Sequence, residues 1–121
     1  MELPVNEQYC YLSTTGRRSG KVHTIEIWFG AEPGSRTIYM LAGGGYSADW
    51  VKNIGANAKV QVRIGSQTFD GTGRVIEGSR EEPVARKLVV AKYYGRDEVG
   101  TSGWEAEALP VAIDLEASKS K

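Results

Sequence analysis

The chain of 121 residues contains one cysteine and one histidine. It carries no net charge, because fifteen lysines and arginines balance fifteen aspartates and glutamates. Cys10 alone forms neither an intramolecular disulfide nor a multi-cysteine metal site. The single histidine, His23, argues against a zinc site and against a Ser-His-Asp triad, so no metal is expected. The neutral total argues against a protein that binds nucleic acid through long-range attraction to phosphate.

Long apolar runs are missing as well. No stretch approaches the roughly 20 residues that a membrane helix needs, and residues 1–7 (MELPVNE) have neither the basic start nor the apolar core of a signal peptide. We therefore expect a cytoplasmic protein without an integral membrane segment. The composition, 40% hydrophobic and 25% charged, is that of a globular protein. At this length we expect one domain over residues 1–121, with a frayed polar tail at 117–121.

Proline is scarce and glycine abundant, at four against fifteen residues. Between the glycines the apolar residues mostly recur with a period of two, which is typical of strands. The predicted strands cover residues 8–14, 23–30, 37–42, 60–64, 67–76 and 108–115. Pro33 and Gly34 suit the two central positions of a type II turn, so residues 23–42 are predicted to form a hairpin. Gly71 and Gly73 mark a bulge or a barrel corner within the fifth strand.

Two helices interrupt the strands, at residues 47–56 and 79–94. Ser47 is the predicted N-cap of the first helix, and Gly95 ends the second. The predicted buried stripe of the second helix consists of Val84, Leu88 and Ala91. About six short, largely antiparallel strands with two or three helices predict a mainly β fold, a small closed barrel. The lack of alternating strands and helices argues against a Rossmann sheet.

The densest functional feature is residues 13–23 (STTGRRSGKVH), which contain three permanent cations, several hydroxyls and two glycines, with no acidic residue. Arginine forks match phosphate oxygens, and glycines let backbone N–H groups approach an anion. The loop therefore fits a phosphate or polycarboxylate ligand, and a solvated basic hairpin is the alternative interpretation. Residues 97–118 contain six acidic residues and no Lys or Arg. The neutral total thus combines a local cationic loop with an acidic C-terminal third.

A second feature is residues 42–50 (AGGGYSADW), a glycine run that follows a strand and opens a helix. Helix N-termini attract anions, and bare glycines let a flat ring lie against the backbone. The dinucleotide fingerprint is incomplete, because Ala48 stands where the third glycine belongs. A flexible linker is the alternative. Aromatic residues that could line a pocket for a planar ligand, each also explained by packing, are Trp28, Tyr46, Trp50, Tyr93, Tyr94 and Trp104.

Three segments of the chain resemble the deazaflavin-dependent nitroreductase family. They are YLSTTGRRSGKVHTIEIWF (residues 11–29), LAGGGYSADWVKNIGANAKVQVRIG (residues 41–65) and LPVAIDL (residues 109–115). The most specific part is the TTGRRSG element followed by W-x-x-N-x-x-x-N. The resemblance implies a split β-barrel like that of FMN-binding proteins. It also implies coenzyme F-420, a deazaflavin, as the cofactor and an oxidoreductase as the class of enzyme.

The resemblance also implies roles for individual residues. Those expected to hold the phosphate and oligoglutamate tail of the cofactor are Arg17, Arg18, Ser19 and Gly20, assisted by His23. Those expected to border the deazaflavin ring, or to present backbone to it, are Ile25, Glu26, Ile27, Trp28, Ala42, Gly43, Gly44 and Gly45. Trp50 and Asn53 would complete the site. No catalytic residue is assigned, and the candidate donors to an electron acceptor are Tyr46, Ser47 and Tyr94.

The implied reaction is hydride transfer from the reduced cofactor to a small-molecule acceptor such as a quinone, an enone or an activated nitro compound. Three alternatives stay open. The first is an FMN-dependent split-barrel oxidoreductase, and the second is a non-catalytic barrel that binds a cofactor or a lipid-like ligand. The third is an oligonucleotide-binding barrel, against which the zero net charge counts. The sequence is compatible with a homodimer and with a monomer.

Overall fold

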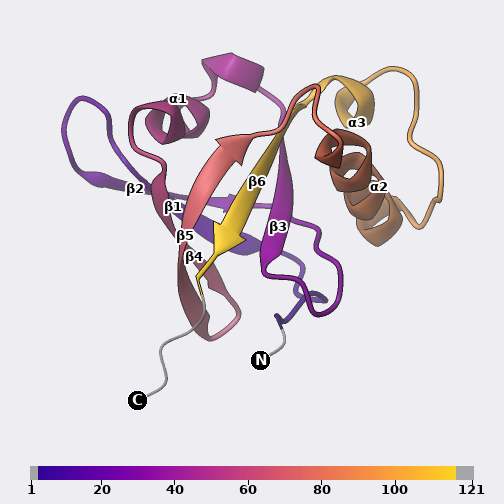
Figure 1. Cartoon of the computed structure of the whole chain (residues 1–121), viewed down its shortest axis with the longest axis horizontal. Helices are drawn as coiled ribbons and strands as arrows, with labels where there is room; N and C mark the ends of the chain where they lie inside the picture. The colour runs from indigo at the N-terminus through magenta and orange to yellow at the C-terminus, as the bar shows by residue number, and fades with distance from the viewer. Residues whose placement is uncertain (1–2, 117–121) are drawn as a thin grey trace.

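Residues 3–116 are described in a computed structural model, which places six strands around a common core with helices outside them (Figure 1). The elements in chain order are β1 (Cys10–Thr15), β2 (Val22–Ile27), β3 (Thr37–Ala42), the 3-10 turn η1 (Gly45–Ser47), α1 (Asp49–Ala56), β4 (Lys59–Ile64), β5 (Gln67–Val75), α2 (Glu81–Tyr94), α3 (Trp104–Glu107) and β6 (Leu109–Leu115). All six predicted strands and both predicted helices are present, with ends that differ by a few residues. The tail at 117–121 lies outside the described residues.

The strands form one sheet in the order β2-β1-β4-β5-β6-β3, and every neighbouring pair is antiparallel. The two edges of the sheet meet at one pair of residues. Gly30 N–H donates to the carbonyl of Tyr39 at 2.9 Å, and Tyr39 N–H donates to the carbonyl of Gly30 at 2.8 Å. This is the one backbone bridge between the two edges within residues 3–116. The barrel is therefore closed at one point and split elsewhere, as the resemblance implied.

The predicted hairpin over residues 23–42 forms only in part, because its two arms pair at Gly30 and Tyr39 alone. The turn itself forms, since Gly34 has a φ of 81° and Ser35 N–H donates to the carbonyl of Glu32 at 3.0 Å. The strands on either side of it take other partners, β2 pairing with β1 and β3 pairing with β6. A local turn signal determines a reversal of the chain, but strand pairing depends on which distant strands offer a matching apolar face.

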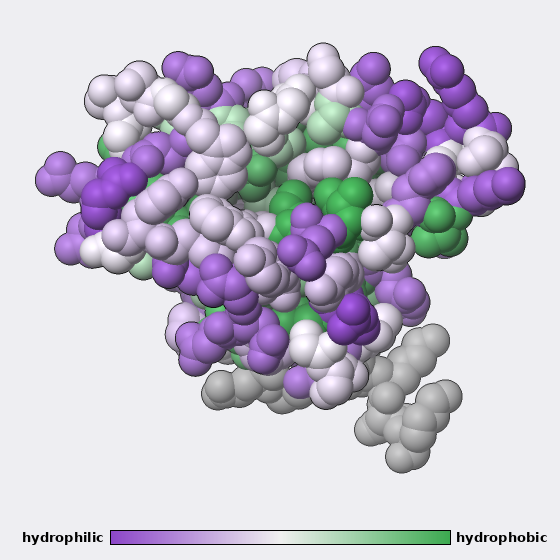
Figure 2. All heavy atoms as spheres, turned by 180° about the vertical axis from the view of Figure 1, so that it is seen from behind, coloured by the Kyte–Doolittle hydropathy of each residue, from purple (hydrophilic) through white to green (hydrophobic). Residues whose placement is uncertain are grey.

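The core lies inside the curled sheet. In β4 the residues Val60, Val62 and Ile64 are buried and alternate with exposed ones, as the period of two predicted. Cys10 is fully buried and behaves as a small apolar side chain. β6 is buried on both faces because α2 packs across the outer side of both β6 and β3 (Figure 1). Seen from behind, hydrophobic residues reach the surface only in small separate areas (Figure 2).

The helices depart from the prediction in two respects. Ser47 belongs to η1, and α1 begins at Asp49 after Ala48, which makes no side-chain capping bond. Gly95 ends α2 in the left-handed conformation as predicted, with a φ of 66°. The predicted stripe is wrong: the buried residues of α2 are Ala85, Arg86, Val89 and Val90. Apolar residues occur on several sides of this helix, so their spacing alone does not show which side faces the sheet. The side that packs on the sheet is the one with the small residue Ala85, which contacts Tyr39 and Ala112.

Candidate functional site

The loop between β1 and β2 is a compact, hydrogen-bonded turn. Gly16 N–H donates to the carbonyl of Lys21 at 2.7 Å, and Gly20 N–H donates to the carbonyl of Gly16 at 2.9 Å. Gly20 has a φ of 73°, which explains the glycine at this position. Ser19 Oγ accepts a hydrogen bond from Lys21 N–H at 3.1 Å. The cationic segment found in the sequence is thus held in one conformation by its own backbone.

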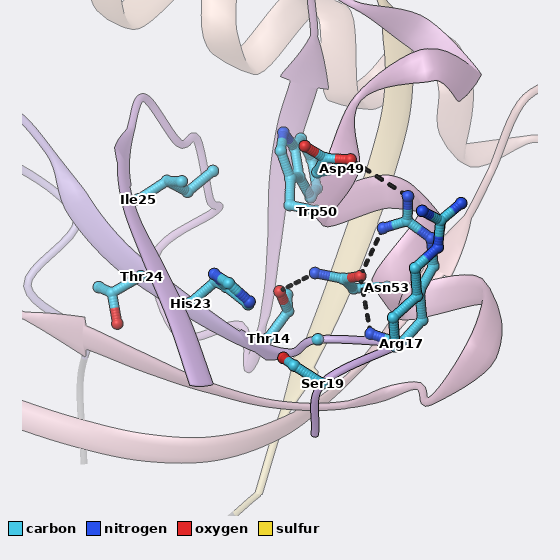
Figure 3. Close-up of a pocket in the computed structure, with 11 residues that line it drawn as sticks. Thr14, Arg17, Ser19, His23, Thr24, Ile25, Asp49, Trp50 and Asn53 are labelled. Carbon is cyan, nitrogen blue, oxygen red and sulfur yellow. Dashed lines mark hydrogen bonds and ion pairs between the residues drawn. The ribbon is translucent and has the colours of Figure 1, made fainter. Parts of the chain in front are cut away.

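Asn53 of α1 clamps this loop to the helix (Figure 3). Its side chain is buried, and its Oδ1 accepts hydrogen bonds from Arg17 N–H at 3.2 Å and from Arg17 Nη1 at 2.8 Å. Its Nδ2 donates to Thr14 Oγ1 at 3.1 Å. Arg17 also forms an ion pair with Asp49, 3.2 Å between Nη2 and Oδ1. Asn53 therefore works through Arg17 and Thr14, in addition to lining the cavity beside them.

This arrangement encloses a cavity of about 470 Å³, here named the cationic cavity. Its lining residues are Thr14, Gly16, Arg17, Arg18, Ser19, His23, Thr24, Ile25, Asp49, Trp50 and Asn53. A Cβ on Gly16 would lie 2.7 Å from His23 Nε2 and 2.9 Å from Ser19 Oγ. Glycine at this position therefore leaves room for the imidazole and the hydroxyl beside the turn. Within residues 3–116 no hydrogen bond or ion pair engages the Arg18 guanidinium, which leaves its donors available to a ligand.

A second cavity of about 520 Å³, here named the aromatic cavity, adjoins the first. Its lining residues are Tyr9, Ile25, Glu26, Ile27, Trp28, Leu41, Ala42, Gly43, Trp50 and Trp104. Ile25 and Trp50 line both cavities, so the two lie side by side. A Cβ on Gly43 would lie 3.2 Å from Trp104 Nε1. The absence of a side chain there lets the indole approach and leaves the backbone of Gly43 open to a flat ligand.

The wall of the aromatic cavity is built from packed rings. Trp28 stacks on Tyr93 with ring centroids 4.1 Å apart and planes 5° from parallel. It also makes edge contacts with Trp104 at 5.8 Å and with Tyr94 at 6.1 Å. Such stacked and edge-on contacts stabilise the arrangement beyond the area that they bury. Trp28 is consequently held in one orientation by α2 and α3.

Lys92 and Tyr93 fix the backbone at the end of this wall. Phe29 N–H donates to Tyr93 Oη at 3.0 Å, and Lys92 Nζ donates to the carbonyl of Phe29 at 3.0 Å. The ammonium also lies 3.6 Å from the centroid of the Phe29 ring, a cation–π contact. Burial lowers the pKa of Lys92 to about 8 and raises the pKa of Tyr93 to about 12. Helix α2 thus positions the segment that carries Trp28.

The structure brings most of the predicted cofactor residues to these two cavities. The exceptions, which line neither, are Gly20, Gly44 and Gly45. The candidate donors lie outside as well. Tyr46 Oη donates to Glu77 at 3.0 Å, which raises the pKa of Tyr46, and Ser47 is exposed in η1. Tyr94 is the candidate whose ring packs against a cavity wall, through Trp28.

Trp104, one of the aromatic residues that the sequence offered for a pocket, does line the aromatic cavity. The lining residues that the sequence did not single out are Tyr9, Thr14, Gly16, Thr24, Leu41 and Asp49. Thr14 and Gly16 lie in the cationic segment, and Asp49 lies in the glycine-rich segment at residues 42–50. Both segments were predicted to bind a ligand, so these three residues could have been found from their position. Nothing in the linear spacing links Arg17 to Asn53, 36 positions away. The described part of the chain contains no group of three metal-ligating side chains and no helix long and apolar enough to cross a membrane.

Residues 2–116 match the sequence profile of the F420H(2)-dependent quinone reductases. The chain belongs to this family. The solved structure of an F420-H2 dependent reductase, FDR-A, is similar to it, with 28% identity over 90% of this chain and 94% of that one and a TM-score of 0.64. A domain-swapped dimer is similar as well, with 28% identity, coverages of 90% and 80% and a TM-score of 0.65. Membership in the F420H(2)-dependent quinone reductases makes this chain an oxidoreductase with coenzyme F-420 as its cofactor.

The fold is shared more widely than the sequence. A proposed 5-nitroimidazole antibiotic resistance protein from Bacteroides thetaiotaomicron has a TM-score of 0.72 at only 12% identity, with 97% of this chain and 83% of that one covered. This likeness concerns the barrel alone.

The residues present fit the cofactor of the family. A cavity lined by Arg18 and His23 suits an anionic tail, and the adjoining cavity, with its indoles and the backbone of Gly43, suits a planar ring. Because Ile25 and Trp50 line both cavities, the two are close enough to receive the two parts of one ligand.

Proposed function

We propose that the protein transfers hydride from reduced coenzyme F-420 to a small electrophilic acceptor of the quinone, enone or activated nitro class. The observation that carries the proposal is a cationic cavity next to an aromatic one, in a member of a family of F420H(2)-dependent quinone reductases. A long ligand with one anionic end and one flat end fits this shape. A binding barrel without redox activity, or an oligonucleotide barrel, gains no comparable support from the family match.

In this proposal the loop between β1 and β2 binds the tail. Arg18, Ser19 and His23 offer donors to phosphate and carboxylate oxygens, while Arg17 is held in place by Asn53. Because the loop is already hydrogen bonded to itself and to α1, little conformational entropy is lost when the tail binds. Gly20 contributes the left-handed turn rather than a direct contact.

The aromatic cavity holds the ring, and the bound cofactor supplies the hydride. Ile25, Ile27 and Trp50 provide apolar surface that excludes water, and Trp28 forms a flat wall fixed by Tyr93. These side chains orient the reacting partners, which is the larger part of what a protein contributes to such a transfer. Tyr94 lines neither cavity, but its ring packs edge-on against Trp28 of the cavity wall. It is the proposed hydrogen-bond donor to an acceptor that binds over this edge of the wall, where negative charge develops on the acceptor.

The experiment follows intrinsic fluorescence, since all three tryptophans of the chain line the aromatic cavity. The purified protein is titrated with oxidised and reduced coenzyme F-420 and with FMN, and turnover is then measured with menadione and a nitroaromatic. We expect strong quenching by the deazaflavin and weaker binding of FMN. Turnover should fall in Tyr94→Phe while cofactor affinity stays unchanged. Binding of FMN equal to or tighter than that of the deazaflavin would contradict the proposal.

Arg18→Ala tests the tail site. Losing a charge-assisted hydrogen bond to an anion should weaken deazaflavin binding about tenfold without changing the melting temperature, because no described contact within the protein is lost. Arg36→Ala is the matched control, since Arg36 is also exposed and lines neither cavity. Equal effects of the two substitutions would contradict a tail site at Arg18.

Assembly as a homodimer belongs to the same proposal. Its support is the similarity to a domain-swapped dimer at 28% identity. Light scattering on the samples used for the titrations measures the mass in solution, and a mass of one chain would contradict a homodimer.

A further inference from the structure

Asp49 is the one acidic residue among those that line the cationic cavity. It is the first residue of α1, and its side chain is 86% exposed. Its Oδ1 lies 3.2 Å from Nη2 of Arg17 (Figure 3). An anion that enters the cavity therefore meets an arginine that is already paired with a carboxylate of the protein.

Arg17 has two unlike partners. Asn53 is neutral and buried, and it also holds Thr14, so its bond to Arg17 Nη1 is a fixed anchor. Asp49 is exposed, and an exposed ion pair of this kind contributes little to stability. Its carboxylate can turn into water while Asn53 keeps the guanidinium in place. Nη1 of Arg17 is thus anchored on Asn53, whereas Nη2 can exchange Asp49 for another anion.

We infer that Asp49 competes with the anionic tail of the ligand for Arg17. Asp49 thereby lowers the affinity of the cationic cavity for highly charged tails. This inference rests on the function proposed above. Arg17 exchanges the carboxylate of Asp49 for a phosphate or carboxylate oxygen of the tail. Repulsion between Asp49 and the tail grows with the number of negative charges on the tail, because the Coulomb energy is proportional to the product of the charges. Asp49 is consequently a specificity-determining residue for tail charge.

The same carboxylate also favours exchange of the cofactor. A cofactor that is oxidised in each turnover has to be reduced again or replaced, and a competing carboxylate within the site speeds its departure. The groups that face Asp49 across the cavity are Arg17, Arg18 and His23 from the β1–β2 loop and the start of β2. All three are basic residues, so removal of Asp49 leaves a cavity whose remaining ionisable lining residues are all basic.

The test is Asp49→Asn in the full chain, titrated with oxidised coenzyme F-420 at low ionic strength and followed by tryptophan fluorescence. Two unit charges about 4 Å apart in water change an equilibrium about fivefold, so we expect binding to be about three- to fivefold tighter. The gain in affinity over the wild type should be smaller at about 0.5 M salt, and it should increase with the number of glutamates in the tail. It should be absent for the deazaflavin nucleoside that lacks the phosphate and the tail.

Asp97→Asn is the control. It changes the net charge by the same amount, and Asp97 lies in the connection between α2 and α3, away from the residues that line the cationic cavity. We expect wild-type binding from this variant and also from Asp49→Glu, which retains the carboxylate. Asp49→Ser, with a short polar side chain suited to the start of a helix, replaces Asp49→Asn if the latter unfolds.

The outcomes separate the two proposals. If the wild-type chain does not bind the deazaflavin at all, the proposed function fails. If the wild type binds while Asp49→Asn and Asp49→Ser bind equally well or more weakly, the inference about Asp49 is overturned and the proposed function stands. A similar gain in Asp97→Asn would show that net charge alone is responsible, which also overturns the inference.

Discussion

At the scale of single residues, the side chains that shape the site are held by contacts outside it. Phe29 is fully buried, and its backbone N–H and C=O groups are bound by Tyr93 and Lys92 of α2. Because Trp28 precedes Phe29 and stacks on Tyr93, these two bonds also determine where the wall of the aromatic cavity lies. The same contacts partly bury the ammonium group of Lys92, and its loss of hydration is unfavourable for folding.

This cost predicts a pH dependence of stability. Burial lowers the pKa of Lys92 to about 8, from 10.5 for a free side chain. Between these two values the unfolded chain binds more protons than the folded one, so the contribution of Lys92 to stability rises as the pH rises through this window. We expect the free energy of unfolding of the wild type, relative to Lys92→Met, to increase by roughly 1–2 kcal/mol between pH 7 and pH 10.

Urea denaturation of both proteins across this pH range measures the difference. Cys10, whose pKa burial raises to about 12, opposes the rise above pH 9 in each protein, and comparing the two variants removes most of its effect. A difference that stays constant with pH would show that the Lys92 ammonium is as well solvated in the folded state as in the unfolded one.

At the scale of elements, close approach of β5 to its neighbours depends on glycine. Gly71 and Gly73 lie where β5 passes from pairing with β4 to pairing with β6, which is the barrel corner that the sequence predicted. A Cβ on Gly71 would lie 3.0 Å from the backbone oxygen of Asp114. A Cβ on Gly73 would meet the methyl end of Ile54 of α1 at 2.9 Å. The first neighbour is backbone and the second is a side chain that can move.

Gly71→Ala should therefore destabilise the protein by about 1–3 kcal/mol, because the paired strand β6 has to shift to make room. Gly55→Ala is the matched substitution: Gly55 lies in α1 with nothing within 4 Å of an added Cβ. It should stabilise the protein by about 0.5–1 kcal/mol through helix propensity. Thermal and urea unfolding of both variants measure these changes. A Gly71→Ala variant as stable as the wild type would contradict the tight β5–β6 contact.

At the scale of the whole molecule, the zero net charge is the sum of two unlike regions. The cationic loop lies between β1 and β2, beside α1, whereas many of the acidic residues of the C-terminal third lie around α3 on the other side of the barrel (Figure 1). Two of these acidic residues form ion pairs, Glu105 with Arg96 and Asp114 with Arg74. Within residues 3–116 the cationic loop is therefore separated from these acidic residues, and the zero net charge of the chain leaves no generally basic surface.

This distribution predicts selective binding of small polyanions. Deazaflavin affinity should fall several-fold between about 0.05 and 0.5 M salt, because partly exposed charges are screened. Duplex DNA should not bind at about 0.15 M salt, since a single loop neutralises few phosphates. Fluorescence titration at several salt concentrations and a gel-shift assay measure the two effects. Tight DNA binding, or affinity for the deazaflavin that does not depend on salt, would contradict this interpretation.

The sequence by itself determined the strands, the two long helices, the reversals at Gly34 and Gly95 and the cationic loop, because these features depend on residues close together in the chain. Only the tertiary structure decided that β3 pairs with β6 instead of β2, that Ala85 faces the barrel, and which of the six candidate aromatic residues line the aromatic cavity. It also decided that Asn53 and Asp49 share Arg17. The physical reason is that each of these contacts joins residues distant in sequence, and their choice of partner depends on shape and packing that linear spacing does not encode.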